Sequence, residues 1–239
     1  MKLSIILPAY NEESNIKKTV ESVFDFIKNK GVESWEIIVV NDGSKDRTGD
    51  TVRDMTKSIP SLKLVEHFPN RGYGGALRAG FEASQMDWIF FMDSDGQFDI
   101  KEIELLMAQV DKGYDIVIGD RTNRNDPFIR KLNAFGWKVI ITLFFGYLAR
   151  DIDCAFKLFK RDILKKIKLE SNGAMVSTEF LAGARARGYK ISEVPVTHLS
   201  RIAGTPTGAN IKVIMKAFKD LIAFKMRLIR ELRKEKIQD

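Results

Sequence analysis

The sequence predicts an α/β protein in which a mostly parallel sheet is covered by helices on both faces. Three observations lead to this fold class. Short apolar runs rich in β-branched and aromatic residues alternate with helical patterns through the first half of the 239-residue chain. These runs are almost continuously apolar, as expected for strands buried on both faces. The composition, 44% hydrophobic and 30% charged, is that of a globular protein with a good core.

Strands and helices alternate in the first half. The first helix shows the pattern clearly, because Ile16, Val20, Val23 and Ile27 fall on one of its faces. The expected strands are residues 3–7, 35–40, 62–66, 88–92 and 114–118, and the expected helices are residues 12–29, 46–57, 74–84 and 100–110.

The alternation weakens after residue 122. We expect loops at 123–133 and 203–209, helices at 133–148, 175–187 and 210–236, and strands at 154–159 and 190–196. Segment 134–149 comes nearest to a membrane span, but it contains Lys138 and two glycines, so a buried or interface helix is expected. No run of ~18 apolar residues occurs. The predicted organisation is one domain at residues 1–209, followed by a helix at 210–239.

Polar residues follow five of the predicted strands. They lie at residues 8–12, 41–44, 70–72, 93–97 and 119–121. In open parallel sheets, ligands bind beyond the carboxyl ends of the strands. We therefore predict that these turns converge on one ligand site at that edge. The alternative is that they are simply polar, as strand-to-helix loops often are.

Asp93 and Asp95 follow a buried strand, and a turn at Gly96 can aim both carboxylates at one point. Such oxygens suit Mg²⁺ or Mn²⁺, ions usually bound by one or two carboxylates together with substrate phosphates. Gln97 adds a neutral oxygen. We therefore predict a divalent metal that holds a nucleotide diphosphate. A calcium loop is the alternative, but Phe98 occupies the position where such a loop requires glycine.

Other polar residues near the strand ends carry weaker predictions. Asp99 is expected to cap the helix that follows it. His67 is expected to be structural, whereas His198, close to Arg201, could contact a ligand. Asp42 comes directly after a predicted strand, where its carboxylate could accept hydrogen bonds from a base or a ribose.

The glycine-rich segment at 70–80 opens a helix, so it could let a phosphate or a ring approach the backbone. It does not match a dinucleotide-binding fingerprint, because Leu77 stands where the third glycine is required. It does not match a P-loop either, because no Gly-Lys-Ser/Thr follows. A redox enzyme or a P-loop enzyme is therefore disfavoured.

An ordered set of motifs makes the sequence similar to glycosyltransferase family 2, whose members have the GT-A fold. The motifs are LPAYNEESNI, VVNDGSKDRT, NRGYGGALRAG, FMDSDGQFD, GDR, DCAFKLFKRD and EVPVTHLSR, spread over most of residues 1 to about 209. Within the family, the sequence most resembles dolichyl- and polyprenyl-phosphate sugar synthases. The resemblance implies a metal-dependent, inverting transfer of a hexose from a UDP- or GDP-sugar to a lipid phosphate.

The resemblance also implies roles for individual residues. Asp95, Arg121 and Glu179 would take part in catalysis, with Glu179 near the acceptor. The implied metal ligands are Asp93, Asp95 and Gln97; the implied donor contacts are Pro8, Tyr10, Glu12, Asp42, Asp93 and, at the diphosphate, Arg201; and the implied acceptor-phosphate contacts are Arg121 and Arg130.

The acceptor is less well defined than the donor. A lipid phosphate is already an anionic nucleophile that arginines can orient, whereas a hydroxyl acceptor needs a base, for which Glu179 is the candidate. Relatives often have a Ser-Lys pair after the glycine that matches Gly204. In this sequence Thr205 follows that glycine, and the lysine is missing. Arg121 and Arg130 could instead form a solvated basic surface. A hydroxyl acceptor is therefore one alternative, and a nucleotide-sugar-binding protein without turnover is another.

Residues 210–239 are predicted to form a basic amphipathic helix, with nine Lys and Arg against four Asp and Glu. Such a helix can lie in the headgroup layer of a membrane, or it can pack on the core or on a partner subunit. The net charge of +7, concentrated in this helix, points to an anionic surface rather than to nucleic acid. The single cysteine, Cys154, fits a reducing compartment. We expect a cytoplasmic protein, peripheral on the cytoplasmic face of the membrane.

Overall fold

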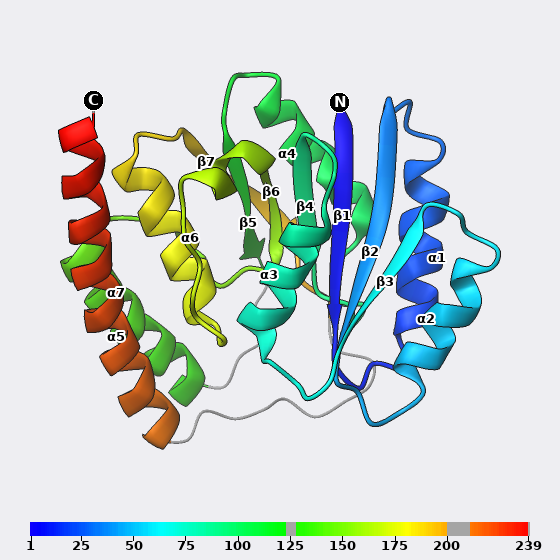
Figure 1. Ribbon diagram of the computed structural model, residues 1–239, viewed down its shortest axis with the longest axis horizontal. Helices are drawn as coiled ribbons and strands as arrows, with labels where there is room; N and C mark the ends of the chain where they lie inside the picture. The colour runs from blue at the N-terminus through cyan, green and yellow to red at the C-terminus, as the bar shows by residue number, and fades with distance from the viewer. Residues whose placement is uncertain (123–127, 200–210, 239) are drawn as a thin grey trace.

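The computed structural model describes residues 1–122, 128–199 and 211–238, with the backbone alone described at 128–135, 211–218 and 238. Within these ranges, seven strands form one sheet in the order β3-β2-β1-β4-β6-β5-β7. The strands are β1 (Lys2–Ala9), β2 (Ser34–Asp42), β3 (Leu62–His67), β4 (Trp88–Met92), β5 (Ile116–Thr122), β6 (Phe156–Lys160) and β7 (Ile191–Thr197). Neighbours are parallel except at β6, which is antiparallel to β4 and β5. The predicted α/β class is confirmed, and the carboxyl ends of the parallel strands lie at the bottom of Figure 1.

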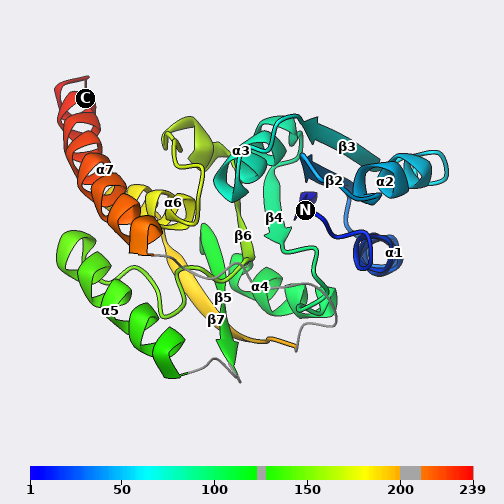
Figure 2. The ribbon, with the colours of Figure 1, turned by 90° about the horizontal axis from the view of Figure 1, so that it is seen from below.

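Helices cover both faces of the sheet (Figure 2). The described helices are α1 (Ile16–Ile27), α2 (Thr48–Thr56), α3 (Tyr73–Ala83), α4 (Ile103–Val110), α5 (Phe128–Phe145), α6 (Met175–Ala186) and α7 (Ile211–Gln238), with the 3-10 turns η1 (Ile100–Glu102) and η2 (Arg161–Lys165). α3 and α6 lie on one face, and α1 and α4 lie on the other. α5 and α7 lie side by side beyond α6.

Aromatic side chains hold the centre of the sheet on both faces. Phe90 of β4 packs edge-on against Phe156 of β6, with ring centroids 4.7 Å apart. On the α3 and α6 face, Phe159 of β6 packs on Phe81 at 5.4 Å and on Phe180 at 4.6 Å. Burying each of these rings stabilises the fold by roughly 1.5–3 kcal/mol. This packing fixes β4, and with it the start of the loop that carries the two aspartates.

Several strands extend further toward the carboxyl edge than the sequence predicts, among them β2 and β5. β2 continues to Asp42, because its ladder with β3 pairs Asp42 with His67. β5 continues to Thr122, because β7 pairs with it as far as Thr197. Asp42 and Arg121 therefore belong to strands rather than to the loops after them, and sheet pairing fixes their backbones.

The second half departs most from the predicted boundaries. α5 begins at Phe128, so the later part of the loop predicted at 123–133 is helical. β6 begins at Phe156, because Cys154 belongs to a turn in which its N–H donates to the carbonyl of Asp151. The sequence does not predict η2. The loop predicted at 203–209 lies outside the described residues.

One face of α7 packs against the protein. Leu221, Phe224 and Leu228 are buried, and the ring of Phe224 lies 5.2 Å from that of Phe145 in α5. Packing on the core, one of the predicted alternatives, therefore accounts for this face. None of the described helices is both long enough and apolar enough to cross a membrane.

Candidate active site

The loop at residues 93–97 leaves β4 at the carboxyl edge and is anchored to its neighbours. The hydroxyl of Ser94 donates to the carbonyl of Pro8 in β1 at 2.8 Å. The N–H of Gln97 donates to Oδ1 of Asp95 at 3.1 Å. These contacts fix the backbone of the loop, so both aspartates emerge from one defined turn.

The carboxyl group of Asp93 is unusually easy to protonate. Burial and the neighbouring carboxylate of Asp95 raise the pKa of Asp93 to about 7, against the opposing effects of Arg121, a hydrogen bond with Tyr73, and Lys157. Two carboxylates that disfavour each other's charge form a site that attracts a divalent cation. The oxygens at this turn therefore fit Mg²⁺ or Mn²⁺.

The two carboxylates do not enclose an ion by themselves. In the parts of the chain that the structure describes, no group of three or more His, Cys, Asp or Glu side chains could hold a metal ion. Mg²⁺ usually keeps several waters and takes further oxygens from substrate phosphates. A site with two carboxylates at an open edge suits an ion that is shared with a diphosphate.

Arg121 lies on β5, and Asp151 holds its guanidinium. Nε donates to Oδ2 of Asp151 at 2.5 Å, and Nη2 donates to Oδ1 at 2.8 Å. Burial alone would lower the pKa of Arg121, but the Asp151 carboxylate raises it, so the guanidinium stays charged. Its charge also lowers the pKa of Asp93. Arg121 therefore shares an electrostatic neighbourhood with the two aspartates.

Lys157 is a buried cation in the same neighbourhood, and sequence reasoning assigned it no role. Its ammonium group donates to the carbonyl of Cys154 and lies 5.3 Å from the centre of the Phe91 ring. Burial lowers the pKa of Lys157, while nearby acidic groups oppose this effect. A lysine inside the otherwise apolar run FKLF is the sequence signal that could have identified it.

Asp42 is buried at the end of β2, and two donors orient its carboxylate. Nδ1 of His67 lies 2.9 Å from Oδ1 of Asp42, and the N–H of Arg71 donates to the same oxygen at 2.9 Å. The side-chain amide of Asn70 donates to the Asp42 carbonyl at 2.6 Å. His67, predicted to be structural, orients Asp42.

The turns after β1 and β2 are joined to each other. Tyr10 is 46% exposed directly after β1. The N–H of Glu12 donates to the hydroxyl of Thr48 at 2.9 Å. The side-chain oxygen of Asn11 accepts a hydrogen bond from the N–H of Lys45 at 2.8 Å. The turns that carry the predicted nucleoside contacts therefore form one connected unit.

Gln97 ties the aspartate loop to the segment after β7. Its Nε2 donates to the carbonyl of Leu199 at 2.9 Å, and its own carbonyl accepts a hydrogen bond from the N–H of Leu199 at 2.8 Å. Arg201, just beyond, lies outside the described residues. The side chain of Arg130, on α5, also lies outside them.

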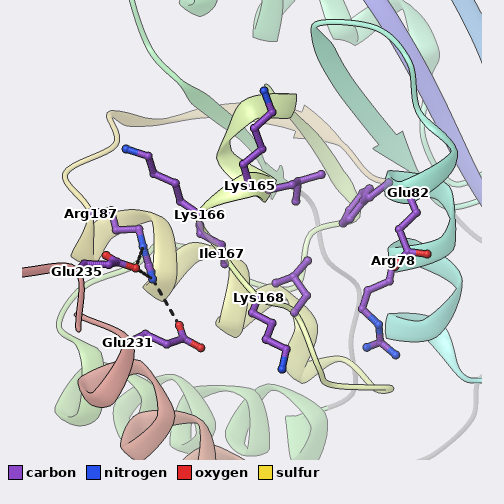
Figure 3. Close-up of a pocket in the computed structure, with 12 residues that line it drawn as sticks. Arg78, Glu82, Lys165, Lys166, Ile167, Lys168, Arg187, Glu231 and Glu235 are labelled. Atoms are coloured by element: carbon purple, nitrogen blue, oxygen red, sulfur yellow. Dashed lines mark hydrogen bonds and ion pairs between the residues drawn. The ribbon is translucent and has the colours of Figure 1, made fainter. Parts of the chain in front are cut away.

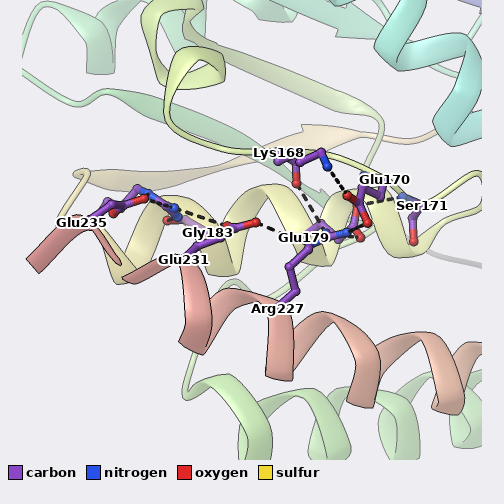
Figure 4. Close-up of polar contacts among 9 residues, drawn as sticks. Lys168, Glu170, Ser171, Glu179, Gly183, Arg227, Glu231 and Glu235 are labelled. Atoms are coloured by element: carbon purple, nitrogen blue, oxygen red, sulfur yellow. Dashed lines mark hydrogen bonds and ion pairs between the residues drawn. The ribbon is translucent and has the colours of Figure 1, made fainter. Parts of the chain in front are cut away.

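Glu179, the candidate base for a hydroxyl acceptor, is engaged by the protein itself. Its Oε2 accepts hydrogen bonds from the N–H groups of Glu170 and Ser171, both at 2.9 Å, and its Oε1 lies 2.8 Å from Nη2 of Arg227 (Figure 4). The residue is only 3% exposed. A general base must reach the acceptor proton, but the protein's own donors already bind both oxygens of this carboxylate.

Two glycines of the 70–80 segment, Gly72 and Gly74, lie against another part of the protein. The N–H of Gly74 donates to the carbonyl of Asn172 at 2.9 Å. A Cβ atom at Gly72 would collide with the Asn172 carbonyl, and one at Gly74 would collide with the Ser171 carbonyl. These glycines therefore admit a neighbouring turn of the protein itself.

A cavity of about 600 Å³ lies between α3, the segment after β6, α6 and α7 (Figure 3). None of its lining residues belongs to the turns at the carboxyl edge. Two cations on its walls pair with acidic neighbours: Arg187 with Glu231 and Glu235, and Lys168 with Glu170. This cavity is therefore not the candidate active site.

Sequence comparisons show which known proteins this chain resembles. Residues 4–168 match the family model described as Glycosyl transferase family 2. A dolichyl-phosphate beta-glucosyltransferase of Trichomonas vaginalis is 33% identical over 209 residues, which cover 81% of this chain and 64% of that relative. An undecaprenyl-phosphate 4-deoxy-4-formamido-L-arabinose transferase of Pectobacterium atrosepticum is 31% identical over 89% of this chain and 64% of its own length. The chain thus spans about 64% of the length of these relatives.

Comparison with solved structures supports the fold. Glucosyl-3-phosphoglycerate synthase from Mycobacterium tuberculosis, in complex with phosphoglyceric acid, superposes with a TM-score of 0.72 at 19% identity, over 95% of this chain and 79% of that one. The same enzyme in complex with Mn²⁺, UDP-glucose and phosphoglyceric acid gives 0.71 at 18% identity, over the same shares of the two chains. At such low identity the likeness establishes the fold alone, and it confirms the predicted GT-A architecture.

Proposed function

We propose that this chain transfers a hexose from a UDP- or GDP-sugar to a polyprenyl phosphate with inversion. The basis of the proposal is that the chain belongs to glycosyl transferase family 2, whose model matches residues 4–168. Two relatives carry dolichyl phosphate and undecaprenyl phosphate in their names, and they support this class of acceptor. A structural neighbour bound to Mn²⁺ and UDP-glucose supports a nucleotide-sugar donor and a metal.

The observation that carries the proposal is the pair of carboxylates, Asp93 and Asp95, on one anchored turn at the carboxyl edge. Asp93, Asp95 and Gln97 would hold Mg²⁺ or Mn²⁺, and the bound ion would stabilise charge on the leaving diphosphate. A hydrogen bond from Tyr73 to Asp93 would orient one of the two carboxylates. The fixed backbone of this turn would place both groups before the donor arrives.

The donor nucleoside would lie across the turns after β1 and β2. Asp42 is fixed by His67 and by the N–H of Arg71, so its carboxylate is ready to accept a hydrogen bond from a base or ribose. Further donor contacts would come from Pro8, Tyr10, Glu12 and, at the diphosphate, Arg201.

The acceptor phosphate would bind Arg121 together with Arg130. Asp151 holds the Arg121 guanidinium in a bidentate pair, which fixes its plane for a phosphate oxygen to approach. A phosphate acceptor needs orientation rather than a base. The engagement of Glu179 with protein donors therefore favours a phosphate over a hydroxyl acceptor.

The lipid would reach the enzyme at the surface formed by α5 and α7. Leu143 on α5 is 79% exposed, and Ile222 and Met226 on α7 are 44% and 53% exposed. Lys219 and Arg233 on α7 are also exposed. Exposed apolar groups beside cations suit the headgroup layer of an anionic membrane. We place the enzyme at the cytoplasmic face of such a membrane.

The test measures the transfer of labelled hexose from UDP- and GDP-sugars in the presence of Mn²⁺. Each donor is incubated with either a polyprenyl phosphate or soluble hydroxyl acceptors. We expect the label to pass into the organic phase only with the lipid phosphate, and transfer to stop when the metal is chelated. Label confined to water-soluble glycans would contradict the proposed acceptor and support a hydroxyl acceptor instead.

A further inference from the structure

A continuous series of polar contacts connects α7 to the interior of the protein, and it begins at Arg227 (Figure 4). Nη2 of Arg227 lies 2.8 Å from Oε1 of Glu179, and its Nη1 forms an ion pair with Glu170. Its guanidinium also packs over the ring of Phe224, 5.4 Å from the ring centre. Arg227 therefore fixes α7 to two carboxylates on the body of the protein.

Glu179 passes this restraint to the turn at residues 170–172. Its second oxygen accepts hydrogen bonds from the N–H groups of Glu170 and Ser171, both at 2.9 Å. Hydrogen bonds to a charged acceptor in a buried position are strong and directional. The position of the turn therefore depends on Glu179, and the position of the Glu179 carboxylate depends on Arg227.

The 170–172 turn also contacts α3, at Gly74 and Arg78. Arg78 donates from Nη1 to the Ser171 carbonyl at 2.5 Å and from Nη2 to Oδ1 of Asn172 at 2.6 Å. The N–H of Gly74 donates to the Asn172 carbonyl at 2.9 Å. Because a Cβ atom at Gly74 would collide with Ser171, the turn and the glycine-rich segment are in close contact, and neither can move far alone.

The glycine-rich segment orients both candidate donor carboxylates. The N–H of Arg71 donates to Oδ1 of Asp42 at 2.9 Å. The hydroxyl of Tyr73 forms a hydrogen bond with Asp93. A displacement of this segment would therefore misplace the donor contacts at two points.

We propose that Arg227 and Glu179 are positioning residues for the donor site, acting through the 170–172 turn on Asp42 and Asp93. The C-terminal helix then has a second role beyond its exposed face, because it holds the donor pocket in its binding geometry. The inference rests on the proposed function, which assigns the donor to Asp42 and Asp93.

The test compares Arg227→Met with Arg230→Met, a matched control that removes the same charge from an exposed position on the same helix. Binding of UDP and GDP is measured by calorimetry with Mn²⁺, without acceptor or lipid, well below the melting temperature of each variant. We expect Arg227→Met to weaken the Kd of the nucleotide that the wild type binds by about tenfold, and Arg230→Met to leave it unchanged. Arg227→Lys should recover part of the affinity, because it keeps a charge for Glu179.

Two further readouts separate positioning from general stability. The KM for the nucleotide sugar should rise in Arg227→Met while the KM for the acceptor stays the same. Amide hydrogen exchange at residues 70–75 should accelerate in Arg227→Met and not in Arg230→Met. A role limited to stability would lower the melting temperature, accelerate exchange without preference for residues 70–75 and leave the KM for the nucleotide sugar unchanged, which would overturn the inference.

A second pair of variants serves if Arg227→Met does not fold. Gly74→Ala presses against the Ser171 carbonyl, whereas a Cβ atom at Gly173 meets nothing within 4 Å. Nucleotide binding weakened by Gly74→Ala and not by Gly173→Ala supports the inference, and equal binding overturns it. If the wild type transfers sugar but Arg227→Met or Gly74→Ala binds nucleotide normally, only the inference fails. If the wild type binds neither UDP nor GDP, the proposed function fails and the inference fails with it.

Discussion

Two groups of carboxylates in this protein are built in opposite ways. At the carboxyl edge of the sheet, burial and Asp95 raise the pKa of Asp93 to about 7. Between α6 and α7, the protein itself supplies donors to both oxygens of Glu179, and Lys168 and Arg227 lower the pKa of Glu170. The family resemblance implies a catalytic role for both Asp95 and Glu179.

The difference teaches how to tell a functional carboxylate from a structural one. A buried carboxylate whose oxygens are matched by protein donors is part of the framework. A carboxylate left beside another negative charge is in an unfavourable state that a bound cation relieves, and such sites gather where chemistry takes place. The following predictions test this contrast, from the largest expected effect to the smallest.

Asp95→Asn should have the largest effect on activity. The substitution keeps the shape of the side chain but removes one of the two charges that would hold the metal. We expect kcat/KM for transfer to fall by about 10²–10³, with no loss of thermal stability because a repulsion is removed. Steady-state assays and melting curves on the same samples check this outcome.

Asp99→Asn is the control for that prediction. Asp99 is exposed, and its carboxylate caps η1 by accepting a hydrogen bond from the N–H of Lys101 at 3.0 Å. Asparagine is also a good cap, so activity and stability should both remain near those of the wild type. Equal losses of activity in the two variants would remove the distinction between a metal ligand and a capping residue.

Glu179→Ala should show the reverse pattern. The substitution leaves two N–H groups and part of Arg227 without their acceptor, so the free energy of unfolding should fall by about 2–4 kcal/mol. At saturating donor, kcat should stay close to the wild-type value, because the carboxylate touches no reacting group. Urea denaturation and initial rates measure the two quantities. A loss of kcat by about 10²–10⁴ at unchanged stability would instead identify a general base.

Asp93 should make the stability of the folded protein depend on pH. The pKa of Asp93 is raised in the folded protein, so the unfolded chain releases its proton first as pH rises from about 4 to 7. The folded state of the metal-free protein therefore loses stability through this window, and the loss persists above pH 7.

Asp93→Asn should remove that slope. We expect the variant to exceed the wild type in unfolding free energy by at least about 1 kcal/mol at pH 8 and to match it near pH 4. Urea titrations in EDTA across this range provide the measurement. A variant less stable than the wild type at pH 8 would show that Asp93 is a framework carboxylate like Glu179.

The sequence predicts the first half of the fold more accurately than the second. Local patterns identify β1 to β4 and α1 to α4, because buried parallel strands are almost continuously apolar. The antiparallel direction of β6 and the extension of β5 to Thr122 come from pairing between distant segments, which local patterns do not contain.

The residues of the candidate site also differ in how well the sequence predicts them. The turn with Asp93 and Asp95 can be located from spacing alone, because it directly follows a buried strand. The sequence predicts no role for Asp151 or Lys157, because their significance depends on contacts with Arg121 and Phe91, which lie in other segments of the chain. The contacts of Glu179 cannot be predicted from the local sequence, because its partner Arg227 lies far along the chain, on α7.

Crystals of the protein grown with Mn²⁺ and UDP or GDP, and measured at the manganese absorption edge, test the central claim most directly. The account predicts an anomalous peak within about 2.5 Å of carboxylate oxygens of both Asp93 and Asp95, with the diphosphate on its open side. A manganese peak elsewhere, such as in the cavity beside Arg187, with the aspartate turn unchanged, would contradict it.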